Sequence, residues 1–206
     1  GLGGSARAGI KLGEGNNDEA NKIFNVSAVL LTVIGVFLSV LTFFLAKNIV
    51  ILFGCPDSAV SLATSYLKIY SLGTVFVMLA QGMNAYITTQ GYSGAAMISV
   101  LIGAVANIAL EPLFIFIFDM GVSGASLATV ISQFISFVWI TAFFFSKKSV
   151  FEFRIKDMKW DTRRVFSIVS LGFSPFVMTI TECAIQIVFN VNLNISTGGN
   201  KDYTAA

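Results

Sequence analysis

The sequence contains no histidine and few charged residues. Only 12% of its 206 residues are Asp, Glu, Lys or Arg, about half the share in a typical soluble domain. The absence of histidine excludes a His-ligated metal centre and a His-dependent catalytic triad. The formal net charge of +2 is too small to indicate a nucleic-acid partner.

Cysteine is also scarce. Cys55 and Cys183 lie far apart and belong to no spaced motif, so we interpret both as inert apolar residues. The chain begins with Gly instead of Met and opens without the charged and apolar regions of a signal peptide. We expect the sequence to be a piece of a longer protein that continues at both ends.

Hydrophobic residues, in contrast, make up 55% of the chain, and its mean hydropathy is +0.81. A helix needs about 20 apolar residues to cross a bilayer, and five stretches reach that length: 27–46, 69–89, 95–118, 122–146 and 165–190. Residues 1–10 are too short to span and are expected to be the last turns of a preceding helix. The pattern predicts an all-α fold, a polytopic membrane helix bundle.

The connections between these stretches set the orientation. The residues IVILFG extend the first stretch beyond Lys47, and the connections that follow the first three stretches, GCPDS, QGYSG and DMGVSG, are short. Only 147–164 is long, so neighbouring helices are expected to be antiparallel. Ten of the 13 basic residues fall on the side of this long connection, and three fall on the other side: Lys47, Lys68 and Lys201. The positive-inside rule therefore places 147–164 in the cytoplasm and predicts a multi-pass protein of the bacterial inner membrane.

Two acidic residues, Glu111 and Glu182, lie inside apolar stretches that contain no Lys or Arg to pair with. An ionisable group at that depth costs several kcal/mol and usually faces a cavity or the bundle interior. Such a carboxyl can exchange a proton or hold a metal cation, and either property suits ion coupling. We therefore favour a functional role for both residues.

The surroundings of Glu111 strengthen its case. One face of its stretch carries polar or small residues at intervals of four: Ser99, Gly103, Asn107 and Glu111. Pro112 cannot donate a backbone hydrogen bond, which frees the carbonyl of Ile108. A carboxylate, an amide oxygen and a spare carbonyl within two turns suit a hard cation such as Na⁺, or a proton relay.

Other stretches carry polar stripes as well. Their members are Thr74, Gln81, Asn84 and Thr88; Ser126, Thr129, Gln133 and Ser136; and Thr179, Glu182, Gln186 and Asn190. Polar residues in membrane helices often serve only as packing and hydrogen-bonding groups, and we favour that interpretation for the serines. For Asn107, Gln81 and Asn84, packing and function remain equally open.

Three segments resemble multidrug and toxic compound extrusion (MATE) transporters. The central signature of that family is similar to AQGMNAYITTQGYSGAAMISVLIGAVANIALEPLFIFIFDMGVSGASLATVISQ. The end of its second helix and the following cytoplasmic loop are similar to GLGGSARAGIKLGEGNNDEA, and the start of its second half to LGFSPFVMTITECAIQIVFN. The resemblance covers nearly the whole chain.

The resemblance implies two six-helix lobes in a V-shaped arrangement, joined by a cytoplasmic connection. The five stretches would be helices three to seven of twelve. Residues 1–146 would form the first lobe without its first helix, residues 147–164 the connection, and residues 165–206 the truncated start of the second lobe. The fold would thus hold most of one lobe and the first helix of another.

The resemblance also implies a function. The family exports amphipathic, often cationic compounds in exchange for Na⁺ or H⁺, a property linked to antibiotic resistance. Its first-lobe cation site joins an acid on the first helix, which precedes this sequence, to an Asn and an acid on the fifth helix and a Thr on the sixth. These residues fall on Asn107, Glu111 and Thr129, with Glu where many members have Asp. Further candidates for substrate or coupling contacts are Glu182, Gln186, Asn190, Gln81 and Asn84.

We therefore expect an antiporter that is not an enzyme, acts as a monomer at full length, contacts membrane lipid and needs no cofactor beyond Na⁺ or H⁺. No metal site is expected apart from Na⁺ at Asn107 and Glu111. Alternatives are a flippase-like member for lipid-linked saccharides, an intramembrane enzyme or scaffold, and a non-functional fragment. The flippase would need basic residues inside its spans, and an enzyme would need clustered catalytic groups. The spans contain neither.

Overall fold

The computed structural model describes residues 1–158 and 161–196. Within these ranges every regular element is helical: α1 (Leu2–Gly13), α2 (Asn17–Leu52), α3 (Val60–Thr89), α4 (Ser93–Pro112), the π-helix η1 (Leu113–Ile117), α5 (Gly121–Phe144), the 3-10 helix η2 (Ile155–Asp157) and α6 (Thr162–Ser196). Five helical segments are long and apolar enough to cross a membrane: α2, α3, α4 together with η1, α5 and α6. The predicted all-α membrane bundle is confirmed.

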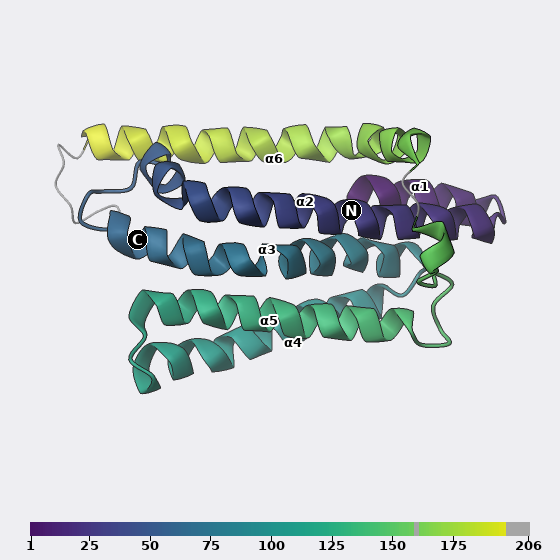
Figure 1. Ribbon diagram of the computed structural model, residues 1–206, viewed down its shortest axis with the longest axis horizontal. Coiled ribbons are helices and arrows are strands. Elements are labelled where there is room, and N and C mark those ends of the chain that lie inside the picture. Colours follow the sequence, from purple (N-terminus) through teal and green to yellow (C-terminus); the bar gives the residue numbers. More distant parts are fainter. Residues whose placement is uncertain (159–160, 197–206) are drawn as a thin grey trace.

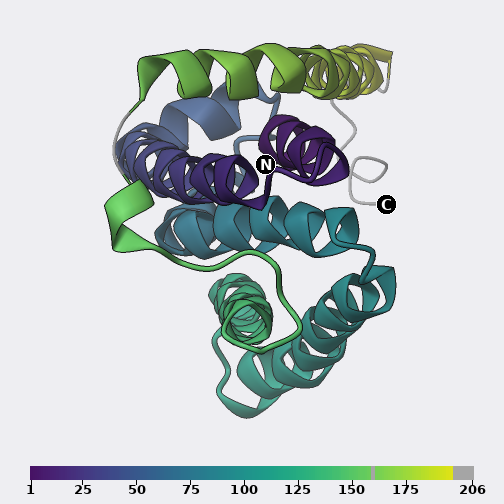
Figure 2. The same ribbon diagram turned by 90° about the vertical axis from the view of Figure 1, so that its right-hand side faces the viewer.

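The long helices run side by side along the length of the molecule (Figure 1). α3 packs against both α2 and α5, α5 packs against α4, and α6 packs against α1 and α2. Seen nearly end on, α6 lies on one side of the bundle, α4 and α5 lie on the other, and α1, α2 and α3 fill the space between them (Figure 2). The chain therefore places α6 away from α4 and α5.

The helices extend beyond the apolar stretches that predict them. α2 begins at Asn17, well before the apolar stretch, because the Asn16 side chain accepts a hydrogen bond of 3.1 Å from the Glu19 amide and caps the helix. Asp18 and Glu19 in the first turn complement the positive end of the helix dipole. Hydropathy marks the part of a helix that suits the bilayer, whereas capping marks where the helix begins.

Helix α1 contains most of residues 1–10, which the sequence predicts to be the last turns of a helix. It crosses α6 at very short range, because the backbone of Ile168 and Gly172 lies where a Cβ on Gly3 would stand. Only glycine allows two helix backbones to approach this closely. This crossing joins α6 to the rest of the bundle.

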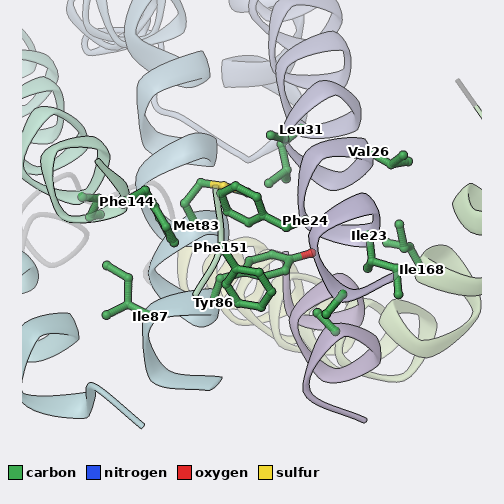
Figure 3. Packing of buried hydrophobic residues seen from close by; sticks show 14 of the residues in the cluster. Ile23, Phe24, Val26, Leu31, Met83, Tyr86, Ile87, Phe144, Phe151 and Ile168 are labelled. Atoms are coloured by element: carbon green, nitrogen blue, oxygen red, sulfur yellow. The ribbon is translucent and has the colours of Figure 1, made fainter. Parts of the chain in front are cut away.

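The main apolar core lies at the end of the bundle nearest the 147–164 connection. Phe24 of α2 stands at its centre, with ring centroids 5.2 Å from Tyr86, 4.8 Å from Phe144 and 5.1 Å from Phe151 (Figure 3). The buried hydroxyl of Tyr86 donates a 2.6 Å hydrogen bond to Ser27 Oγ, so its polar end is satisfied within the core. α2, α3, α5 and the connection thus share one packed centre.

The connection is docked onto the first helices along residues 149–154. The Asn21 side chain donates to the carbonyl of Val150 (3.2 Å) and accepts from the amide of Glu152 (2.8 Å). One turn later, Asn25 donates to the carbonyl of Glu152 (2.9 Å) and accepts from the amide of Arg154 (3.0 Å). Each amide side chain therefore pairs with two backbone groups of the connection, as a neighbouring strand would.

Two further contacts complete this docking. Gln90 Oε1 accepts a 2.7 Å hydrogen bond from the amide of Val150. Between the two asparagine contacts, the fully buried Phe151 ring stacks on Phe24. Hydrogen bonds from amide side chains to its backbone and one buried ring hold this part of the connection on the lobe, so it is not a free linker.

Candidate functional site

A cavity of about 370 Å³ lies between α3, α4 and α5. Its polar wall consists of amides and hydroxyls and contains no charged side chain. The polar lining residues are Gln81, Asn84, Ser99, Asn107, Thr129, Ser132, Gln133 and Ser136. Four of the predicted site residues, Gln81, Asn84, Asn107 and Thr129, therefore meet at one cavity.

Asn107 and Thr129 are in direct contact across the α4–α5 interface. Asn107 Nδ2 lies 3.4 Å from Thr129 Oγ1, and the Thr129 hydroxyl donates its own hydrogen to the carbonyl of Ala125 at 3.0 Å. Within the described part of the chain, the Oδ1 atom of Asn107 accepts no hydrogen bond from another residue. An amide oxygen and a hydroxyl oxygen are thus available at the cavity, and oxygen is the ligand that hard cations prefer.

The close approach of α4 and α5 makes this contact possible. A Cβ on Gly103 would overlap the hydroxyl of Ser136, and that hydroxyl donates a 3.1 Å hydrogen bond to the carbonyl of Ser99. Ser99 and Ser136 are both buried. Small residues let the helix backbones come together, as is usual between membrane helices, so these residues serve as packing groups.

Asn84 joins α3 to the same cavity. Its Oδ1 lies 2.8 Å from the hydroxyl of Ser99, which also lies 2.7 Å from the carbonyl of Ala96. Gln81, one turn earlier on α3, is exposed. The amide of Asn84 is thus bound to the Ser99 hydroxyl of α4, while Gln81 remains open to the cavity.

Glu111 lies beside this cavity and is not part of its wall. It is half-buried, one turn after Asn107 on α4, and within the described ranges it forms neither an ion pair nor a hydrogen bond through its side chain. Pro112 follows directly, and the backbone then changes from α-helix to the π-helix η1. Such π-helical segments are frequent at functional sites.

The candidates on α6 do not join this group. Glu182 and Gln186 are exposed, and α6 packs against α1 and α2, on the far side of the bundle from α4 (Figure 2). The side chain of Asn190 lies outside the described residues. Within residues 1–158 and 161–196, no three acidic or cysteine residues cluster as a metal site would require.

Gln133 is a cavity residue that belongs to a predicted polar stripe but was not among the predicted site residues. It lies one turn after Thr129 on α5 and lines the cavity with Asn107. Its place in the polar stripe of α5 was the sequence feature that could have identified it as a site residue. The stripe does not reveal which helix faces it, because the rotation of α5 against α4 depends on packing.

The comparisons with known proteins agree on one family. A family model described as MatE matches residues 1–113. YpnP of Bacillus subtilis, named a probable multidrug resistance protein, is 30% identical over 169 residues, which are 82% of this chain and 38% of that protein. MepA of Staphylococcus saprophyticus, named a multidrug export protein, is 27% identical over 78% of this chain and 36% of its own length.

Solved structures share the fold. A crystal structure of MATE in a bent conformation superposes with a TM-score of 0.83 at 22% identity, covering 97% of this chain and 44% of that one. An inward-facing MATE family transporter of the MOP superfamily gives a TM-score of 0.78 at 21% identity, over 92% of this chain and 42% of its own. The chain spans less than half the length of the relatives that it matches.

Proposed function

This chain belongs to the MatE family, and we propose that the protein is a secondary active multidrug efflux antiporter in the bacterial inner membrane. It would export amphipathic, often cationic compounds in exchange for Na⁺ or H⁺ and act as a monomer. Members of the family are transporters and not enzymes. The names of MepA and YpnP, which refer to multidrug export and resistance, support the substrate class.

The contact between Asn107 and Thr129 is the observation that carries this proposal. Two oxygen-bearing side chains from adjacent helices meet at a cavity whose wall lacks charge, with the carboxyl of Glu111 one turn away. A Na⁺ ion or proton held by Glu111 would draw the carboxyl toward Asn107 Oδ1, where oxygen ligands are already in place. Residues 1–146 would form the cation-binding lobe, and residues 165–206 the start of the second lobe.

Movement of the two lobes against each other would expose the cavity to each side of the membrane in turn. A cationic drug would compete with the coupling ion for Glu111, and Glu182 with Gln186 would offer polar contacts from the second lobe. A flippase of lipid-linked saccharides is less well supported, since the cavity wall contains no Lys or Arg to hold a phosphate.

The test is ion-driven drug export by the Glu111→Gln variant. Gln keeps the size of the side chain but can neither release a proton nor supply a full negative charge. We expect ethidium export driven by a Na⁺ or pH gradient to fall about tenfold or more, equal to at least ~1.4 kcal/mol of lost coupling, with membrane insertion unchanged.

A matched control is Glu14→Gln, which removes an acid that lies outside the apolar spans and pairs with Lys11. That variant should export normally. Wild-type rates of gradient-driven export in Glu111→Gln would show that Glu111 does not couple the ion.

A further inference from the structure

A second hollow, of about 430 Å³, lies between α4 and α5 and shares no lining residue with the Asn107 cavity. It lies where the first turns of α4 meet the last turns of α5, at the end of the bundle from which the 147–164 connection begins. Ala95 of α4 and Ala142 of α5 line it. Their short side chains leave space between two otherwise well-packed helices.

The sides of this groove are apolar and aromatic. Ile98 and Trp139 line it and are 43% and 41% exposed. Phe143 and Tyr92 meet edge to face with ring centroids 5.4 Å apart. The surrounding surface of both helices is apolar and open to the exterior, as expected of a face that contacts lipid. A flexible hydrocarbon chain fits such a groove.

One end of the groove is polar and carries a positive charge. Lys148 and Ser146 line it there together with Tyr92. In the described part of the chain, Lys148 forms no ion pair and the Tyr92 hydroxyl has no hydrogen-bond partner, whereas Ser146 donates to the carbonyl of Phe143 at 2.7 Å. No acidic side chain lines the groove. An ammonium and a phenolic hydroxyl without acceptors match the oxygens of a phosphate group.

The depth of these residues agrees with a membrane boundary. Trp139 lies seven residues before Ser146, which is about 10 Å along a helix at 1.5 Å per residue. Trp and Tyr favour the interface between lipid and water, and Lys extends toward the headgroups. The excess of basic residues marks this end as the cytoplasmic one, where anionic lipids attract positive charge.

We propose that this groove binds one anionic phospholipid of the cytoplasmic leaflet, with an acyl chain over Ala95 and Ala142 and its phosphate at Lys148 and Tyr92. The apolar groove ends in hydrogen-bond donors that have no partner among the described residues, and these donors favour an anionic lipid. A zwitterionic lipid would place its choline group unfavourably close to Lys148. The proposal does not depend on the identity of the transported substrate.

Trp139 supplies a direct probe of occupancy. This chain has two tryptophans, Trp139 and Trp160, and every tryptophan of the protein other than Trp139 is replaced by Phe. The purified protein in detergent is titrated with phosphatidylglycerol or phosphatidylcholine that carries bromine atoms on its acyl chains, because bromine quenches indole fluorescence on contact. We expect half-maximal quenching at an about fivefold lower concentration of phosphatidylglycerol, the preference conferred by one lysine near the headgroup.

Two variants of the groove and one control variant locate the effect. Lys148→Gln should abolish the preference for phosphatidylglycerol, whereas Lys47→Gln, an exposed lysine at the opposite end of the bundle, should retain it. Ala142→Phe fills the groove and should weaken quenching by both lipids. Equal quenching by the two lipids in the parent protein would overturn the proposal, as would a preference that persists in Lys148→Gln.

Discussion

Gly103 is the residue on which the distance between α4 and α5 depends. Its missing side chain leaves room for the Ser136 hydroxyl, and the same interface carries the contact between Asn107 and Thr129 one turn further along α4. A single methyl group at this position would therefore act on both packing and the candidate cation site.

We predict that Gly103→Ala destabilises the protein by about 1–3 kcal/mol, the usual cost of overpacking, and lowers its thermal unfolding temperature in detergent. The double variant Gly103→Ala with Ser136→Ala should recover most of the loss, since the clash is with the Ser136 hydroxyl. Gly94→Ala is the control, because a Cβ on Gly94 would meet nothing within 4 Å. Equal effects of the Gly103 and Gly94 changes would contradict this account of the interface.

At the scale of elements, the docked part of the connection is held in an extended course along α2 by hydrogen bonds from two asparagine side chains. Its alternate backbone groups pair with Asn21 and Asn25, and Phe151 inserts into the core between them. Because Glu152 and Arg154 donate their amides to asparagine oxygens, the order of these two residues depends on two side chains from α2.

We predict that the double variant Asn21→Ala with Asn25→Ala releases this segment. Hydrogen exchange at the amides of Glu152 and Arg154 should accelerate, while the amide of Val150, held by Gln90, remains protected. Loss of these partly buried hydrogen bonds should cost about 0.5–1.5 kcal/mol each.

Changing both asparagines to Asp separates the effect of the hydrogen bonds that they accept from the effect of those that they donate. Asp keeps the oxygens that accept from Glu152 and Arg154 but cannot donate to the carbonyls, so the two amides should stay more protected than in the alanine variant. Unchanged exchange in the alanine variant would mean that packing of Phe151 and the Gln90 contact order the connection without the two asparagines.

At the scale of the whole molecule, a charged contact links the first helices to α6. The Arg164 guanidinium binds Glu19 of α2 through two hydrogen bonds of 2.8 and 3.2 Å, and it also pairs with Asp161. These groups lie at the cytoplasmic end of the predicted topology, where the two lobes of a rocking transporter would separate. In the proposed transporter, whose lobes move against each other, this pair would hold that end closed.

We predict that Arg164→Glu loosens this end of the bundle. Spin labels at Asn17 and Phe166, both exposed, should show a broader distance distribution in a background without native cysteines. The swap of Glu19→Arg with Arg164→Glu should restore part of the narrow distribution, because Asp161 would still repel the new glutamate. A partly exposed pair of this kind contributes about 1 kcal/mol or less, so the expected shift is modest.

No restoration by the charge swap would show that Arg164 orders this end through packing instead of its charge. Substituting Lys11, whose ion pair with Glu14 lies within the first-lobe segment, is the control. Its loss should leave the distribution unchanged.

The sequence was sufficient to predict the helices and their order, because apolar length and short loops are local properties. The polar stripe through Asn107 and Glu111 could be predicted for the same reason, since four-residue spacing places residues on one face whatever surrounds the helix. Packing between distant residues determined the rest. The packing of α5 on α3 and α4, including the close approach of Gly103 and Ser136, brings Thr129 and Gln133 to Asn107 while Glu111 stays outside the cavity wall. The docking of 149–154 likewise depends on asparagines more than 120 residues away, a pairing that no local pattern encodes.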